Sequence, residues 1–287
     1  MRCTRMVLLA GLLLPPALLA ADKPATPAEQ LEALKKEAET TRSEFYQAYQ
    51  KAKTDKERQD LRDKNDKQIK ARARRALELA QKHPKDPSAV DALSWIIAGG
   101  LGWNGAGEEI QTAFDLLRKD YVTSDKLERV CDIASVYTSS STKPEQFLRA
   151  VVKNNPHRAI QGHACYGLAE LVRRQAKWIE RLRDPEYAKA MEKGMNGDVL
   201  KHLKASDSDK LQHEAEELLE RIIAKYSDLK SFRGTFGEQA KATLFEMKYL
   251  VIGKVAPEIE GEDLDGKRFK LSDYRGKVVV LDFWGNW

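Results

Sequence analysis

Apolar residues recur three or four positions apart near the start of the chain, which is the spacing of one face of a helix. Charged residues stand between these apolar positions, which are Leu31, Leu34, Ala38, Phe45, Tyr49 and Ala52. The stretch TPAE at residues 26–29 is typical of a helix start, because threonine caps, proline fits the first helical position and glutamate returns to the cap. This pattern predicts a long amphipathic helix.

A second helical run extends from about Lys56 to Lys82 and ends at His83-Pro84, because proline lacks the backbone donor that a helix needs. Thr54-Asp55 either separates this run from the first helix or continues it. Its apolar positions are Leu61, Ile69, Ala73, Ala76, Leu77 and Ala80. Two long amphipathic helices in succession predict a helical hairpin or a coiled coil over residues 26–83.

The middle of the chain is more apolar and keeps the helical period. Asn155 and Pro156 are read as a cap and a first helical residue. The stretches CDIASVY and CYGLAEL, at Cys131 and Cys165, stand 34 residues apart, which is the period of tetratricopeptide hairpins. The fold class is therefore mainly α, a helical bundle or degenerate tetratricopeptide-like hairpins, with helices over 87–98, 108–121, 127–137, 146–153, 156–183, 206–226 and 237–250.

The pattern changes at Gly253, where short apolar runs alternate with Gly and Pro. Asp265-Gly266 predicts a tight hairpin turn, because glycine adopts positive φ freely. The predicted strands cover 259–264, 268–271 and 277–283, with a turn over 272–274. We divide the chain into residues 1–21, an α-helical domain over 22–250 (hairpin 26–83, repeat region 87–250) and a second domain over 252–287.

Composition and charge place few limits on function. The 287 residues are 42% hydrophobic and 32% charged, with a formal net charge of +5. The basic excess is spread through segments that are also rich in acids. It therefore favours a solvated helical surface over a nucleic-acid partner.

The first 21 residues have the layout of a secretory signal peptide. Arg2 and Arg5 precede an apolar stretch from Met6 to Leu19, and Ala20-Ala21 offers small residues for cleavage. An uncleaved membrane anchor is the alternative, although the apolar stretch is short for a membrane span. We expect an exported, periplasmic or cell-envelope protein.

Cys131 and Cys165 are the two cysteines that remain after cleavage. They either form a disulfide in an oxidising compartment or are small buried residues on helices. We favour the second interpretation, because nothing nearby in the sequence brings them together.

Several motifs match a known pattern without its structural context. GLGWNG at residues 100–105 fits the dinucleotide fingerprint but follows a helical run and not a strand. GEDLDGKR at 261–268 resembles a P-loop, but Arg268 stands where Ser or Thr would hold magnesium. The acids Glu262, Asp263 and Asp265 lack the spacing of a calcium loop.

Two further sets of residues are weighed as sites. His157 and His163 are six residues apart, so they do not share one face of a helix, and a core or surface role is favoured over metal binding. A basic cluster is interpreted as the solvated face of a long helix and comprises Lys67, Lys70, Arg72, Arg74 and Arg75.

The C-terminal segment has motifs in a fixed order, namely Ala256-Pro257, Asp263 to Lys267, Leu271 to Lys277 and Val278 to Trp284. In this order and spacing it resembles the opening of the redoxin domain of TlpA-like thiol–disulfide oxidoreductases, which is related to the AhpC/TSA peroxiredoxins. Trp287 falls where that family has the tryptophan before a Cys-x-x-Cys pair. The stretch EIE at 258–260 is more acidic than the usual apolar start.

The resemblance implies that residues 252–287 are the N-terminal part of an α/β thioredoxin-like domain, and that the chain is a fragment ending just before the redox cysteines. In the family, the first cysteine lies at a helix N-terminus, where the helix dipole and backbone donors lower its pKa. Cys131 and Cys165 match nothing in that motif. No catalytic, cofactor-binding or metal-ligating residue is therefore assigned.

Two functions remain open. The first is an exported thiol–disulfide oxidoreductase or peroxiredoxin-like antioxidant protein with an N-terminal helical adaptor. The second is a helical scaffold for protein interactions with no enzymatic activity. At the missing redox site, the expected partners are protein thiols or disulfides, or a redox partner protein. A further protein is expected to bind the helical domain. No cofactor, metal or nucleic acid is expected, and contact with a membrane is expected only if the signal segment is not cleaved.

Overall fold

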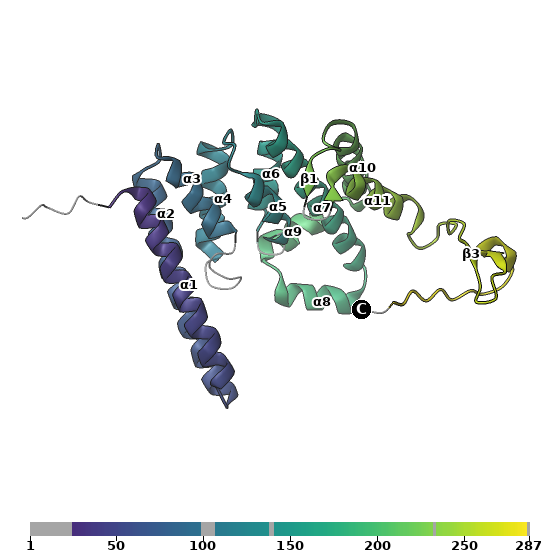
Figure 1. Ribbon diagram of the computed structural model, residues 1–287, viewed down its shortest axis with the longest axis horizontal. Coiled ribbons are helices and arrows are strands. Elements are labelled where there is room, and N and C mark those ends of the chain that lie inside the picture. Colours follow the sequence, from purple (N-terminus) through teal and green to yellow (C-terminus); the bar gives the residue numbers. More distant parts are fainter. Residues whose placement is uncertain (1–24, 99–106, 138–140, 232–233, 286–287) are drawn as a thin grey trace, which may run out of the picture.

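The computed structural model describes residues 25–98, 107–137, 141–231 and 234–285. The prediction of a mainly α fold with a short β segment near the C-terminus is confirmed (Figure 1). The described helices are α1 (Pro27–Lys51), α2 (Asp55–Lys82), α3 (Pro87–Ile97), α4 (Gly107–Asp120), α5 (Glu128–Ala134), η1 (Ser135–Tyr137), α6 (Lys143–Asn154), α7 (Arg158–Arg181), α8 (Pro185–Gly194), α9 (Gly197–Ala205), α10 (Ser208–Lys225), α11 (Phe236–Tyr249) and η2 (Leu271–Tyr274).

Helices α1 and α2 form the predicted hairpin, which projects from the other helices in Figure 1. Thr26 and Thr54 each cap a helix through a capping box, so the chain breaks at Thr54 and starts a second helix. The half of the hairpin next to α3 buries Leu31, Leu34 and Ala38. Its far half keeps only partly buried contacts between the two helices.

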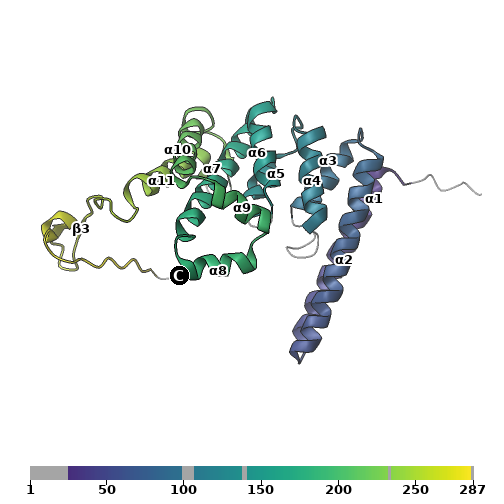
Figure 2. The same cartoon turned by 180° about the vertical axis from the view of Figure 1, so that it is seen from behind.

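The remaining helices lie side by side in an order close to that of the chain. Successive packing partners are α2 with α3, α3 with α4, α4 with α6, α6 with α7, α7 with α10 and α10 with α11. Figures 1 and 2 show the same succession from opposite sides. One apolar core runs through these interfaces and includes Phe114, Phe147 and Phe236, each almost fully buried. A repeat with a 34-residue period stays a prediction.

Helix α7 is the centre of this arrangement, because it packs against α5, α6, α9, α10 and α11. Glycine allows a close approach of α7 to α5. A Cβ atom on Gly167 would lie 2.5 Å from the backbone oxygen of Cys131 on α5. The small residues of CYGLAEL therefore serve helix packing.

Asn155 is not the predicted cap of α7. Its side-chain amide donates to the carbonyls of Val122 and Ser124, at 2.7 and 2.8 Å, and its oxygen accepts from the backbone of His157 at 2.9 Å. The helix begins only at Arg158. Asn155 instead ties the α6–α7 junction to the loop before α5, because a buried amide must satisfy its hydrogen bonds locally.

Helices α8 and α9 were not predicted. Each is short and starts at a polar cap, Asp184 and Asn196 respectively. They enclose a small second apolar cluster of Met191, Val199 and Leu203, packed against Trp178 and other partly buried residues. Each of the two helices has only a few apolar residues, which is not enough to show a helical period in the sequence.

The C-terminal segment stands apart from the helices in both views. It contains a two-stranded antiparallel hairpin, β3 (Glu260–Glu262) and β4 (Arg268–Lys270); the short pair β1 (Lys230–Ser231) and β2 (Gly234–Thr235) precedes α11. The predicted strand over 277–283 is wrong for this structure, in which residues 278–285 belong to no helix or strand. A strand requires a neighbour to receive its backbone hydrogen bonds, and the described residues supply none.

Candidate functional site

The turn of the β3–β4 hairpin forms as the sequence predicts. Gly266 has a φ of +75°. The carboxylate of Asp263 accepts hydrogen bonds from the backbone of Asp265 at 3.0 Å and of Lys267 at 2.9 Å. Asp263 thus closes the turn through its own side chain, as aspartate often does in loops. Among the acids of this stretch, Asp263 holds the turn, whereas Glu262 pairs with Arg268 across the hairpin.

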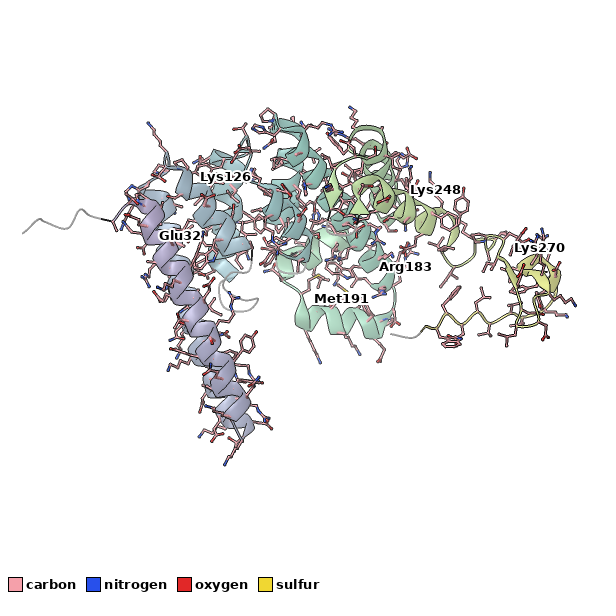
Figure 3. The ribbon with its side chains drawn as sticks, viewed as in Figure 1. Glu32, Lys126, Arg183, Met191, Lys248 and Lys270 are labelled. Carbon is pink, nitrogen blue, oxygen red and sulfur yellow. The ribbon has the colours of Figure 1, made fainter. Side chains whose placement is uncertain are left out.

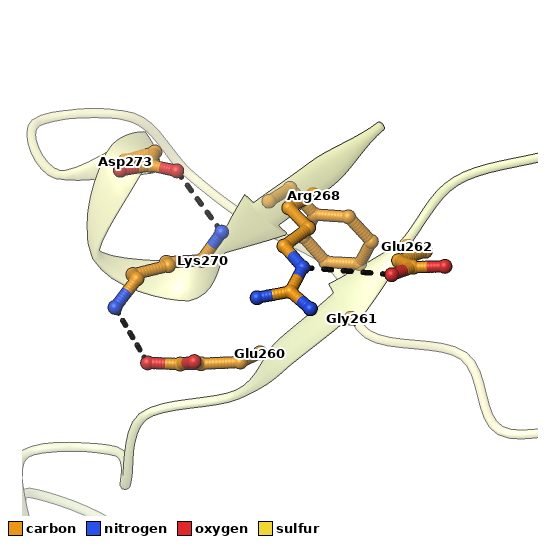
Figure 4. A pocket seen from close by; sticks show the side chains of 7 residues that line it. Glu260, Gly261, Glu262, Arg268, Lys270 and Asp273 are labelled. Atoms are coloured by element: carbon orange, nitrogen blue, oxygen red, sulfur yellow. Dashed lines mark hydrogen bonds and ion pairs between the residues drawn. The ribbon is translucent and has the colours of Figure 1, made fainter. Parts of the chain in front are cut away.

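Opposite charges face each other across the hairpin (Figure 4). Glu260 pairs in register with Lys270, and Glu262 pairs with Arg268. The side-chain separations are 2.6 Å for Lys270 Nζ to Glu260 and 3.5 Å for Arg268 Nε to Glu262. The pKa of Lys270 is raised, chiefly by its hydrogen bond to Glu260. Directly opposed unlike charges stabilise a strand pair, so this face is an internally paired surface.

The opposite face of the hairpin holds Phe269, which lies over Gly261. Just before the hairpin, the carboxylate of Glu258 accepts a hydrogen bond from the backbone of Ser272 at 2.9 Å. The pKa of Glu258 is lowered, first by the side chain and then by the backbone of Ser272. The acidic residue that departs from the family pattern therefore fastens the start of the segment to η2. The pocket of Figure 4 is lined by Glu260, Gly261, Glu262, Arg268, Phe269, Lys270 and Asp273.

After Gly276, with a φ of +81°, the chain runs out as an apolar stretch. Val278 is 97% exposed, Val280 88% and Phe283 82%. The apolar run over residues 278–284 is nearly continuous, which suits a strand that is covered on both faces of a parallel sheet. The segment has a hydroxyl-bearing turn and several carboxylates, but no cysteine lies between residues 252 and 287. Residues 252–287 therefore contain no thiol that could take part in disulfide exchange.

Cys131 and Cys165 are both free and fully buried in the helical core. Burial raises the pKa of Cys131, and it raises the pKa of Cys165 to about 11. The thiolate is the reactive form, so neither thiol is prepared for exchange at neutral pH. The prediction that they are buried helix residues and do not form a disulfide is confirmed.

The basic cluster on α2 is only partly the solvated face that was predicted. Arg72 is buried, its guanidinium lying 3.3 Å from the hydroxyl of Thr41 and 3.8 Å from Glu37 on α1. Arg74 reaches the buried Glu109 on α4 at 2.9 Å. These arginines join α2 to its neighbours, because a buried charge needs a partner.

His157 and His163 are not brought together. His157 is exposed, whereas His163 is 5% exposed on α7. His163 faces two carboxylates of α5: Nδ1 is 2.6 Å from Asp132 and Nε2 is 3.4 Å from Glu128. Sequence reasoning missed these partners, and the only signal for them is the four-residue spacing of two acids on a predicted helix.

The signal-like residues 1–21, the glycine motif at 100–105 and Trp287 lie outside the described residues. Within the described part of the chain, no helix combines the length and apolarity needed to cross a membrane.

Comparison with known proteins places the similarity at the C-terminus. Residues 252–287 match the AhpC/TSA family. The chain is 36% identical over 69 residues to the thiol-disulfide oxidoreductase ResA of Geobacillus thermodenitrificans, which is 24% of this chain and 40% of the relative. It is 53% identical over 36 residues to the ResA protein of Bacillus thuringiensis subsp. konkukian, covering 12% and 21% respectively. No solved structure gives a significant match.

The matched part therefore spans less than half the length of these curated relatives. The C-terminal segment is thus similar to AhpC/TSA-family proteins and to ResA thiol-disulfide oxidoreductases, which confirms the resemblance predicted from its motifs. The similarity stops short of most of the helices described above.

Proposed function

We propose that this chain is the N-terminal part of an exported thiol–disulfide oxidoreductase, with residues 252–287 opening a thioredoxin-like domain. The observation that carries the proposal is the 36-residue redoxin match, in which the Asp263 turn, the Gly276 turn and the apolar run after it keep the order of the family. The exposed faces of Val278 and Val280 support it, because they fit a sheet built with further strands.

The proposed chemistry is thiol–disulfide exchange. A thiolate of the expected Cys-x-x-Cys pair attacks a sulfur of the substrate disulfide, and the departing sulfur leaves as a thiolate. The second cysteine then attacks the mixed disulfide, so that the enzyme becomes oxidised and the substrate dithiol reduced. The redox pair is proposed to follow Trp287, where the resemblance to the family places it. Cys131 and Cys165 do not suit this role, because they are buried with raised pKa values.

The helical domain, residues 22–250, is proposed to be an adaptor that positions the redoxin domain and contacts a protein partner. Its support is the long succession of helices joined to the C-terminal hairpin by an exposed connection that includes Ile252 and Val255. Export is supported by Arg2, Arg5 and the apolar stretch from Met6 to Leu19.

An insulin-reduction assay with dithiothreitol tests the activity. The 287-residue chain is compared with a version extended through the native reading frame. We expect activity only in the extended version, and expect that a Cys131→Ser, Cys165→Ser double variant of it remains fully active. Activity in the 287-residue chain that these serines abolish would place the chemistry in the helices and refute the proposal.

The reading frame after codon 287 decides between the two candidate functions. A Cys-x-x-Cys sequence there supports the oxidoreductase. A stop codon supports the helical scaffold without enzymatic activity, whose structural support is the set of stacked helices with no reactive thiol among the described residues.

A further inference from the structure

Three potential metal ligands converge between α5 and α7, away from the redoxin segment. Glu128 and Asp132 are four residues apart on α5, and this spacing places both carboxylates on one face of the helix. His163 comes from α7 and meets them from the other side. One donor atom from each of the three side chains lies within 4.8 Å of the other two.

The packing of His163 holds its ring in place. The residue is 5% exposed, and its ring meets the edge of Phe236 with centroids 4.8 Å apart and planes at 81°. Phe236 is itself buried and stacked on Tyr166 at 5.0 Å. The carboxylates, in contrast, reach solvent, because 63% of the Glu128 side chain and 37% of the Asp132 side chain are exposed. A fixed imidazole and two accessible carboxylates leave a path for an ion.

The two carboxylates lie at different nitrogens of one ring. A neutral imidazole carries one N–H, so it can donate to Asp132 or to Glu128 but not to both. The other ring nitrogen then presents its lone pair to a carboxylate oxygen. Over the described ranges, neither acid forms an ion pair with a lysine or arginine. A cation bound at that nitrogen would be attracted by the carboxylate beside it.

We propose that Glu128, Asp132 and His163 form a binding site for a divalent transition-metal ion, with Zn²⁺ as its representative. The ion takes Nε2 of His163 and an oxygen of Glu128, and water completes its coordination. Asp132 accepts from Nδ1 and so orients the ring. Imidazole favours Zn²⁺ over Mg²⁺ or Ca²⁺, which prefer all-oxygen sites. Bonds of about 2.0–2.2 Å allow ligand atoms up to roughly 4.4 Å apart, and Nε2 lies 3.4 Å from Glu128.

The position of the site indicates a structural role. His163 stands 31 residues from Asp132, and the ion would therefore join two helices that are distant in the sequence. These helices meet at the close contact of Gly167 with the backbone of Cys131. Metal binding to the folded state only would stabilise this interface in proportion to the free ion concentration.

The test is titration of the chelator-treated full chain with Zn²⁺ by calorimetry, together with thermal unfolding. We expect binding of one equivalent and a higher melting temperature. Glu128→Gln and Asp132→Asn should each weaken binding by at least about tenfold. Because both acids are partly or largely exposed, these variants should still fold. Co²⁺ in place of Zn²⁺ should give visible absorption bands that vanish in His163→Gln.

His213→Gln is the matched control, because His213 pairs with Glu217 at 3.3 Å on α10 but is 74% exposed and, within the described part of the chain, forms no second ion pair. This variant should bind Zn²⁺ as the parent does. The proposal is overturned if the parent shows no saturable binding, or if the α5 variants bind as tightly as the parent. A third result would also overturn the proposal: acidification stabilises the parent, Zn²⁺ does not, and Glu128→Gln removes the stabilisation by acid. In that case His163 would be an imidazolium that pairs with both carboxylates.

Discussion

Asn155 is the single polar side chain whose removal should most disturb the helical domain. It is 1% exposed and makes three hydrogen bonds, two donated to the carbonyls of Val122 and Ser124 and one accepted from the backbone of His157. The loop that it holds leads directly into α5, which begins at Glu128. Asn155→Ala therefore tests both the stability of the fold and the placement of α5 against α7.

Alanine removes all three bonds and fills none of the space. A typical hydrogen bond contributes about 1 kcal/mol net, and each buried group left without a partner costs about 1–3 kcal/mol. We therefore expect the free energy of unfolding to fall by about 3–5 kcal/mol. A change of this size lowers the melting temperature of a domain of about 200 residues by on the order of 10 °C. Zinc binding at Glu128 and His163 should weaken in the same variant.

Thermal and urea unfolding followed by far-ultraviolet circular dichroism provide the measurement. Asn154→Ala is the control, because Asn154 is the exposed last residue of α6 and should change stability by less than about 0.5 kcal/mol. Asn155→Asp keeps the shape but turns a carboxylate oxygen toward two carbonyls, so it should be at least as unstable as Asn155→Ala. Equal stability of Asn155→Ala and Asn154→Ala would refute the reasoning, and so would a stable Asn155→Asp.

Three further outcomes are expected. Gly167→Ala places a methyl group 2.5 Å from a backbone oxygen and should lower stability by about 1–3 kcal/mol in urea unfolding, whereas Gly194→Ala meets open space and should not; equal effects would contradict the packing argument. Cys131 and Cys165 should resist alkylation in the native chain, as read by peptide mass spectrometry, and rapid native labelling would show that burial does not protect them. The pKa of Glu238 is lowered from 4.5 by a backbone hydrogen bond at the start of α11. The stability that the ionised side chain gives to the fold is therefore present above about pH 4.5 and is lost as the pH falls. Glu238→Gln should therefore lose less melting temperature than the parent between about pH 5 and pH 3, and an identical loss would argue against this cap.

The sequence by itself determined the local structure to a large extent. Caps, proline positions and the helical period act within a few residues, so they predicted the α1–α2 hairpin and most of the later helices. They left open whether the chain breaks at Thr54, and the structure shows that it does. The turn at Gly266 followed from the same local chemistry. The redoxin resemblance was also local, because its motifs lie within one continuous segment.

Tertiary structure alone decided the features that join distant residues. His163 meets Asp132 and Glu128 because α7 packs against α5, and no spacing along the chain encodes that contact. Asn155 looked like a cap in the sequence, yet the loop around Val122 recruits its side chain. The residues 278–283 show the converse: their apolar pattern fits a strand, but a strand exists only when a neighbour accepts its backbone hydrogen bonds, and pairing is a property of the whole fold.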